Sequence, residues 1–500
     1  MAYIDIPKEI SSKEILDNEC NLSSNAYKRL LMKNTNFKTL RKLLKDSQSG
    51  KEVGSIAYVK DSEFIFLRTK AINSHLFCLD FVTQGAIQCI KPNSYRAYFK
   101  NFMNLYKNDI LFVTGGNVGE VVFVDKDYTN VIFSSHIVKI QVIKNPYYIF
   151  AMLKHNICRE QVNFSPIGAI KGLDTFKIDY LYNCKIPFPN INAKQTIEFI
   201  EILTQSIITK ERLIKERHAK ILQMIKTELL ENQKPNTFTY AYPTFTELKK
   251  TGRLDTGIYC EEFKRLDFLI KNYKYGSKLF DELEMSMSRG QNLQESCIGK
   301  SIYSQIYKDK FYSLALPTYF SYYGTINKTI YLGNRNNLKT LKKGEIVFGA
   351  EGTFRSIVIL DDVENFITNI HGITLYKNNV LESIFIKLFM DFLASKKFID
   401  FIKVGGHGGS LAQKYWNLIP FPNFPLNLQE QIALLYHNPN AKLNYEELTL
   451  KNFTIQDEAF CKDAGIYELD KSIKYLKNIL NSCINDIIND KEVLMSFTKN

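Results

Sequence analysis

One long uninterrupted helix is the feature that most limits how this chain can fold. Residues 193–232 contain neither proline nor glycine, and isoleucine returns at every seventh position, as Ile200, Ile207, Ile214 and Ile221. This heptad spacing predicts an apolar seam along a helix of roughly 60 Å. Lys210 and Arg217 occupy interleaved seam positions, so the seam is imperfect. A seam of this length cannot be covered by its own helix, and it therefore requires a partner.

The chain also contains an internal duplication. Residues 186–190 and 419–423 both read IPFPN, at an offset of 233. Other matches keep nearly the same offset: NDILF at 108–112 with GEIVF at 344–348, and His136 with His371. A period above 200 residues indicates a duplicated domain and excludes a solenoid of short repeats.

The partner of the central helix is expected near the C-terminus. Residues 467–494 carry a second heptad seam, made of Leu469, Ile473, Leu476, Leu480, Cys483 and Ile487. Because the two units repeat head to tail, we expect the two helices to pair antiparallel. The alternative is that each helix packs only on its own globular unit.

These patterns predict an α+β protein with two similar domains that have mixed β-sheet cores, joined by two long antiparallel coiled-coil helices. The expected domains are residues 1–190 and 236–425, with the central helix at 191–235 and a C-terminal helical region at 426–500. Residues 56–145 are rich in Val, Ile, Phe and Tyr and contain Gly and Asn turns, which predicts several short strands. Residues 37–45 are expected to form a short basic helix, and residues 286–292 a polar loop.

The positive charge is concentrated in the two repeated units. The formal net charge is +13, of which residues 1–190 carry +8 and residues 236–425 carry +6, whereas residues 426–500 carry −3. Two basic modules favour a polyanionic partner, most simply nucleic acid. The chain has no apolar run of 18 residues and no signal-peptide pattern, so we expect a cytoplasmic protein without a membrane partner.

Catalytic motifs are missing from the sequence. It contains no GxxxxGK[ST] phosphate loop, no HExxH metal motif, and no methyltransferase cofactor loop with an NPPY-like sequence. The loop GGHGGS at 405–410 is expected to be structural. His136 and His371 begin repeated strands, and we expect them to be buried hydrogen-bonding groups. The chain is therefore expected to be non-enzymatic, with no metal or cofactor of its own.

Candidate DNA-binding residues lie in predicted loops that interleave basic, amide and aromatic side chains. Arg and Lys reach guanine edges or phosphates, and Asn and Gln pair with adenine. In the first unit the candidates are Lys51, Arg68, Lys70, Arg96 and Lys100. In the second unit they are Arg289, Gln291, Asn292, Lys300, Arg335, Asn336, Asn337 and Lys339. These loops differ between the units while the framework repeats, as expected if each unit reads a different sequence.

The ordered motifs resemble the specificity subunit of type I restriction-modification systems over nearly the whole chain. The motifs are the two IPFPN segments, Gln195, the QEQIA segment at 429–433, the strands at 109–112 and 345–348, and Arg253-Leu254-Asp255 with Tyr259. One departure is Pro439 with an insertion at about 440–465, which interrupts the second conserved helical region.

The resemblance implies two target-recognition domains that read a bipartite double-stranded DNA site with a nonspecific spacer. It also implies methyltransferase subunits, which bring S-adenosylmethionine, and restriction and translocase subunits, which bring ATP and Mg. The chain alone would have no catalytic activity. Three alternatives stay open: the specificity subunit of a related two-subunit system, a scaffold whose two modules bind protein and, third, an enzyme, which activity of the purified chain alone would indicate. DNA binding would weaken steeply with salt, which distinguishes it from the scaffold.

Overall fold

The computed structural model describes residues 3–17, 20, 22, 27–94, 104–163, 178–349, 351–362, 365–405 and 409–498. The chain divides into two compact units. Unit 1 comprises Met1–Leu213, Lys442–Asp463 and Leu469–Asn500, and unit 2 comprises Ile214–Ala441 and Ala464–Glu468. Both units combine helices with small sheets, and the predicted α+β class is therefore confirmed.

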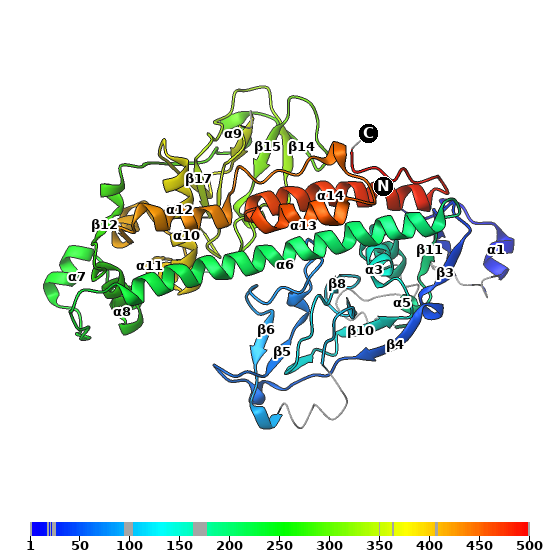
Figure 1. Ribbon diagram of the computed structural model, residues 1–500, viewed down its shortest axis with the longest axis horizontal. Helices are drawn as coiled ribbons and strands as arrows, with labels where there is room; N and C mark the ends of the chain where they lie inside the picture. Colours follow the sequence, from blue (N-terminus) through cyan, green and yellow to red (C-terminus); the bar gives the residue numbers. More distant parts are fainter. Residues whose placement is uncertain are drawn as a thin grey trace. The chain divides into compact units, whose positions relative to one another are not determined.

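The main sheet of unit 1 is antiparallel and has the order β4-β10-β7-β8 (Figure 1). Its strands are β4 (Leu44–Ser49), β7 (Ile110–Val113), β8 (Val121–Phe123) and β10 (Ile137–Val142). A second sheet, β6-β5-β9, contains β5 (Ile65–Leu67), β6 (Ile87–Cys89) and β9 (Val131–Phe133), with β5 and β9 parallel. Buried apolar residues from both sheets form one cluster, so they share a core.

Two short strand pairs and several helices complete unit 1. The pairs join β1 (Ile4–Asp5) to β2 (Arg29–Leu30), and β3 (Phe37–Thr39) to β11 (Lys185–Pro187). The helices include α1 (Ser12–Asp17), α3 (Pro146–Lys154), α4 (Asn156–Asn163), α5 (Ile178–Tyr182) and α13 (Phe453–Asp463). The predicted basic helix at 37–45 is wrong, because Phe37 pairs with Pro187 and only Leu40–Lys42 form a single 3-10 turn. Tertiary pairing overrides the local helical pattern there.

Unit 2 repeats the antiparallel sheet in the order β13-β20-β17-β18. Its strands are β13 (Ser286–Arg289), β17 (Ile346–Gly349), β18 (Ser356–Val358) and β20 (Gly372–Tyr376). A second sheet, β14-β16-β15-β19, contains β14 (Ile302–Ser304), β15 (Tyr312–Ala315), β16 (Ile330–Gly333) and β19 (Phe366–Thr368), with β15 and β19 parallel. The two units thus share a strand order and a parallel pair, which supports the duplication.

The remaining elements of unit 2 follow the same plan. β12 (Ser277–Leu279) pairs with β21 (Pro420–Pro422), as β3 pairs with β11, so each IPFPN segment enters a two-stranded sheet. The helices are α7 (Phe245–Thr251), α8 (Glu261–Lys271), α9 (Glu295–Ile298), α10 (Val380–Ser395), α11 (Phe398–Ile402) and α12 (Leu426–Tyr436). The predicted polar loop at 286–292 is wrong for its first four residues, which form β13 against β20.

The central helix α6 (Ala193–Glu231) is a single helix, as predicted. Its seam residues Ile200, Leu203 and Ile207 are fully buried. The C-terminal helix α14 (Ile466–Ile488) buries its own seam, including Leu469, Leu476 and Leu480. It ends at Ile488, before the expected Leu494, and Asp490 takes a left-handed φ of 57° just beyond it.

Within unit 1, polar contacts show that α6 and the C-terminal segment run antiparallel. Near the start of α6, Asn192 Nδ2 donates to Glu492 at 2.9 Å. Further along α6, Glu211 pairs with Lys477 at 2.8 Å. The partner number falls as the α6 number rises, so the two segments run in opposite directions within unit 1.

Lys210 places a charged side chain in the apolar seam of α6, and a contact with α13 explains why it is tolerated there. The Lys210 side chain is fully buried, and its ammonium group pairs with the carboxylate of Asp457 on α13. Ser206 Oγ donates to the same carboxylate at 2.7 Å and accepts from Lys210 Nζ at 2.6 Å. The segment at 440–465, which the sequence presents as an interruption, therefore supplies a buried counter-charge to the central helix.

Candidate nucleic-acid interface

In unit 2, a glycine positions the residues that follow β13. Gly290 lies so close to the turn after β19 that a Cβ atom on it would overlap the Asn369 carbonyl oxygen. The backbone N–H of Gln291 donates to Thr368 O at 2.8 Å and so fixes the chain beside this turn. Arg289 and Asn292 are partly exposed on either side. Only glycine permits so close an approach, and it holds these candidate residues at one place.

Lys339 joins the same group from a different segment. Its Nζ donates to Ser288 Oγ at 2.6 Å and to the Arg289 carbonyl at 2.8 Å. Its backbone N–H donates to Gln291 Oε1 at 3.0 Å. The structure therefore brings Arg289, Gln291, Asn292 and Lys339 together, although Lys339 lies about 50 positions further along the chain.

A second group surrounds the loop after α9. Asn336 Nδ2 donates to the Ile298 carbonyl at 3.0 Å and ties the loop that follows β16 to the one that precedes β14. Lys300, Arg335 and Asn337 are exposed around this junction. The amide group of Asn336 therefore holds the loop, while its three neighbours present their side chains to solvent.

In unit 1, a glycine allows the same close approach of two backbone segments. A Cβ atom on Gly50, which follows β4, would overlap the Ser134 carbonyl oxygen. The N–H of Lys51 donates to Phe133 O at 2.9 Å, so Lys51 is placed in unit 1 as Gln291 is in unit 2. The Arg68 guanidinium lies 5.2 Å from the Tyr58 ring centroid, and Ser134 N–H donates to Leu67 O at 2.9 Å.

The other candidate residues of unit 1 are Lys70, Arg96 and Lys100. Lys70 is exposed and its side chain lies beside Gly85. Arg96 and Lys100 lie outside the described residues. Lys51 and Arg68 both lie beside the end of β9. Lys70 follows Arg68 by two positions in the sequence.

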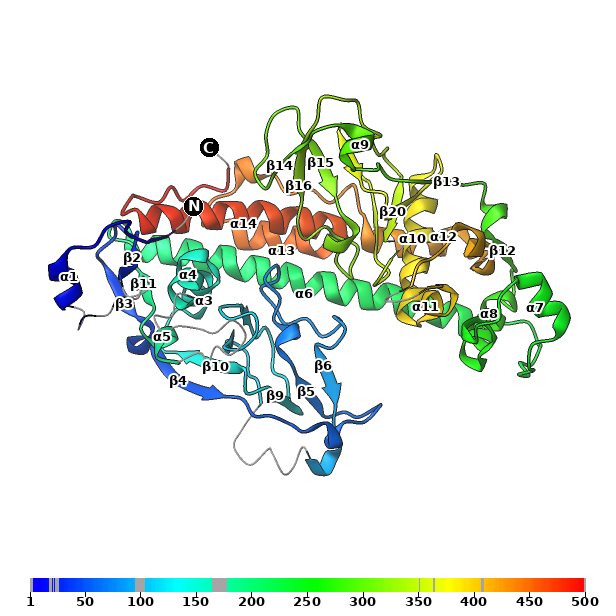
Figure 2. The same ribbon diagram turned by 180° about the vertical axis from the view of Figure 1, so that it is seen from behind.

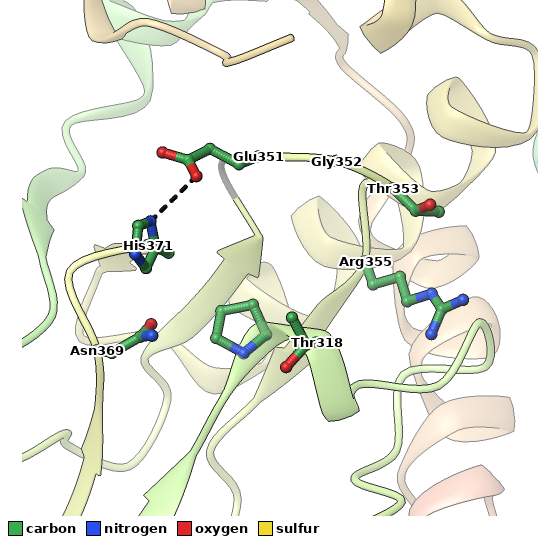
Figure 3. A pocket seen from close by; sticks show the side chains of 8 residues that line it. Thr318, Glu351, Gly352, Thr353, Arg355, Asn369 and His371 are labelled. Atoms are coloured by element: carbon green, nitrogen blue, oxygen red, sulfur yellow. Dashed lines mark ion pairs between the residues drawn. The ribbon is translucent and has the colours of Figure 1, made fainter. Parts of the chain in front are cut away.

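A pocket of about 450 Å³ opens next to the Gly290 turn (Figure 3). Its lining includes Glu351, Arg355, Asn369 and His371. His371 Nδ1 lies 3.1 Å from the Glu351 carboxylate, and Figure 3 shows the two side chains facing each other. Arg289 reaches the same turn, where its Nη1 donates to Ile370 O at 3.3 Å. Carboxylate, guanidinium and amide groups are the ones that read base edges, so the pocket extends the candidate interface.

The equivalent turn of unit 1 also carries a histidine and a carboxylate. The His136 ring lies directly against Gly115, where a Cβ atom would overlap it. Glu52 accepts from Ser135 Oγ at 2.6 Å and Ser134 Oγ at 2.9 Å. Burial alone would raise the pKa of Glu52, but these hydroxyls, with His136 nearby, lower it.

The prediction that His136 and His371 are buried is wrong, because both are exposed at the rim of their sheet. Each histidine lies in the turn directly before its strand, β10 or β20. Sequence reasoning also missed Glu351, Asn369 and Arg355. Their only sequence signal was that they lie next to the repeated glycines and the repeated histidine.

The described part of the chain contains neither a candidate metal site nor a membrane-spanning helix. No group of three or more His, Cys, Asp or Glu side chains lies close enough there to hold a metal ion. None of the helices in these residues is both long and apolar enough to cross a lipid bilayer.

One part of the chain matches a family of known proteins. Residues 60–236, which run from before β5 to the end of α6, match the type I restriction modification DNA specificity domain. This match agrees with the resemblance found in the sequence. No curated protein sequence matches the chain.

Solved structures similar to this chain include two specificity subunits. The type I restriction-modification S subunit from M. genitalium has 14% identity, covering 90% of this chain and 95% of its own, with a TM-score of 0.33. The HsdS subunit from Thermoanaerobacter tengcongensis has 13% identity, covering 91% and 97%, with a TM-score of 0.27. The match to the specificity-domain family covers residues 60–236.

Proposed function

We propose that this chain is the DNA-specificity subunit of a type I restriction-modification complex and recognises a bipartite, gapped site, each unit reading one half. The observation that carries the proposal is the repeated turn beside Gly50 and Gly290. The backbone of the turn is the same in both units, but Lys51 and Glu52 of unit 1 are replaced by Gln291 and Asn292 in unit 2. A turn whose backbone is repeated in both units but whose side chains differ is suited to recognising two different half-sites.

The proposal includes the organisation of the chain and its partners. Residues 1–190 and 236–425 act as target-recognition domains, 191–235 as the spacer helix and 426–500 as the C-terminal helical region. The helices bind methyltransferase subunits and restriction subunits, which carry the catalysis, S-adenosylmethionine, ATP and Mg, and the complex acts on double-stranded DNA in the cytoplasm. A complex that purifies without a separate restriction subunit would favour the related two-subunit system instead.

The proposal is tested by sequencing DNA modification in cells that carry this chain with and without its methyltransferase. We expect a two-part gapped motif to be methylated only when both are present, because this chain selects the site and the methyltransferase modifies it. Methylation that does not depend on this chain would contradict the proposal. The protein-binding scaffold would then be the better explanation.

Salt dependence provides a second prediction. The affinity of the chain with its methyltransferase subunits for a duplex containing the motif should fall about 10³–10⁵-fold between 50 and 200 mM salt, if about six to ten phosphates are contacted. The physical reason is the release of counterions from DNA by the two basic units. Fluorescence anisotropy at several salt concentrations measures this slope, and the assembly of the protein subunits without DNA provides the control. A flat slope would contradict DNA binding by the basic units.

A further inference from the structure

Large apolar side chains gather on the edge strand β14 of unit 2 and on the turn after it. Ile302 is 64% exposed and Tyr303 is 55% exposed, while Ile306 and Tyr307 in the turn are 76% and 65% exposed. β14 pairs with β16 on one side, and no strand of the described residues pairs with its other edge (Figure 2). A patch of this kind on a folded surface marks an interaction site.

The turn that carries Ile306 and Tyr307 is held in one shape. Ser304 Oγ donates to the Ile306 carbonyl at 2.7 Å and accepts from the Ile306 N–H at 3.1 Å. The Tyr307 ring packs edge-on against Tyr331, with centroids 5.5 Å apart. At the far end of the turn, the Phe311 ring packs against Gly333, where a Cβ atom would lie 2.6 Å from it. The exposed tip is therefore preorganised, which lowers the entropic cost of binding.

The surroundings of this tip are strongly basic. Residues 298–311 and 326–340 contain a single anion, Asp309, among six cations: Lys300, Lys308, Lys310, Lys328, Arg335 and Lys339. The patch also lies beside candidate DNA-binding residues, because Lys300 comes two positions before Ile302 and Asn336 donates to the Ile298 carbonyl. An apolar tip among cations suits a polyanion that also has an apolar interior, and duplex DNA with its stacked bases is such a partner.

We propose that Ile306 and Tyr307 form an apolar wedge that enters the DNA minor groove beside the half-site of unit 2, opens a base step and bends the duplex. The inference rests on the proposed function and adds a contact that reads DNA deformability instead of base edges. Proteins that bend DNA through the minor groove insert apolar side chains between base pairs in this way. Flexible pyrimidine–purine steps are then favoured at the wedge position, since they open at the lowest cost.

The test uses the full chain with its methyltransferase subunits and an end-labelled duplex that contains the methylated motif. Energy transfer between the ends should report a bend of about 20–90° for the wild type. In the double variant Ile306→Ala and Tyr307→Ala the bend should return to that of free duplex, and sequencing should show the preference for a pyrimidine–purine step lost at the wedge position while the bases of both half-sites are still required. Ile455→Ala, at a 70% exposed isoleucine of α13, is the matched control and should keep the bend.

Two results would overturn the wedge. One is an unchanged bend in the double variant, and the other is loss of a protein subunit from the complex, which would make the patch a protein-docking surface. Fluorescence of Trp416, the one tryptophan of the chain, which is buried in unit 2, checks that the variant is folded. If no motif depends on the chain, the proposed function and the wedge fail together. If the motif persists with an unchanged bend, only the wedge fails.

Discussion

Replacing Asp457 with alanine is expected to lower the free energy of unfolding by about 3–5 kcal/mol, the cost of leaving a buried charge without its partner. Lys210 is fully buried in the α6 seam, and Asp457 is the carboxylate that its ammonium group contacts. The variant also removes the acceptor of the Ser206 hydroxyl. Urea unfolding followed by circular dichroism measures the change.

Two matched variants separate the buried charge from other effects. Asp470→Ala removes an i,i+4 pair with Lys474, whose side chain is half-exposed, and should change stability by only about 0.5 kcal/mol. The double variant Lys210→Met and Asp457→Leu removes both charges together and should recover most of the lost stability, since an apolar pair of similar volume is often neutral. A loss below about 1 kcal/mol for Asp457→Ala would contradict this account of α13.

The sequence predicted the helices of this fold better than its short strands. The heptad spacing of α6 and α14 is a local pattern, and the buried seams follow it. The pattern also exposed Lys210 as a defect in the seam, but it could not identify Asp457, which lies almost 250 positions away, as its partner. Strands β3 and β13 were missed because their residues look helical or polar, and only pairing with β11 and β20 makes them strands.

The candidate interface was predicted as a set of residue types, without its geometry. Arg289, Gln291, Asn292 and Lys339 come together because Gly290 allows β13 to end against the turn at Asn369. The equivalence of Gly50 with Gly290 was present in the sequence at an offset of 240, but the known repeat has offsets of 233–236. The equivalence of the two glycines was hidden because their offset differs from that of the repeat. The offset differs because the loops between matched strands vary in length.

Replacing Gly50 or Gly290 with alanine is the second change that we expect to have a large effect. Alanine at Gly290 would place its Cβ atom on the Asn369 carbonyl oxygen, and alanine at Gly50 would overlap the Ser134 carbonyl oxygen in the same way. Backbone atoms cannot rotate away as a side chain can, so the strand end must move. We expect each variant to lose about 1–3 kcal/mol of stability and to displace the residue after the glycine, Lys51 or Gln291.

Displacement in one unit should affect one half of the DNA site. With Gly290→Ala, sequencing of methylated DNA should show one half of the gapped motif relaxed or lost, and with Gly50→Ala it should show the same for the other half. Gly54→Ala is the control, because no atom lies within 4 Å of its Cβ position and its φ of −63° suits alanine. If both variants altered the same half, or if Gly54→Ala did as much as either, these two turns would not be where the two half-sites are read separately.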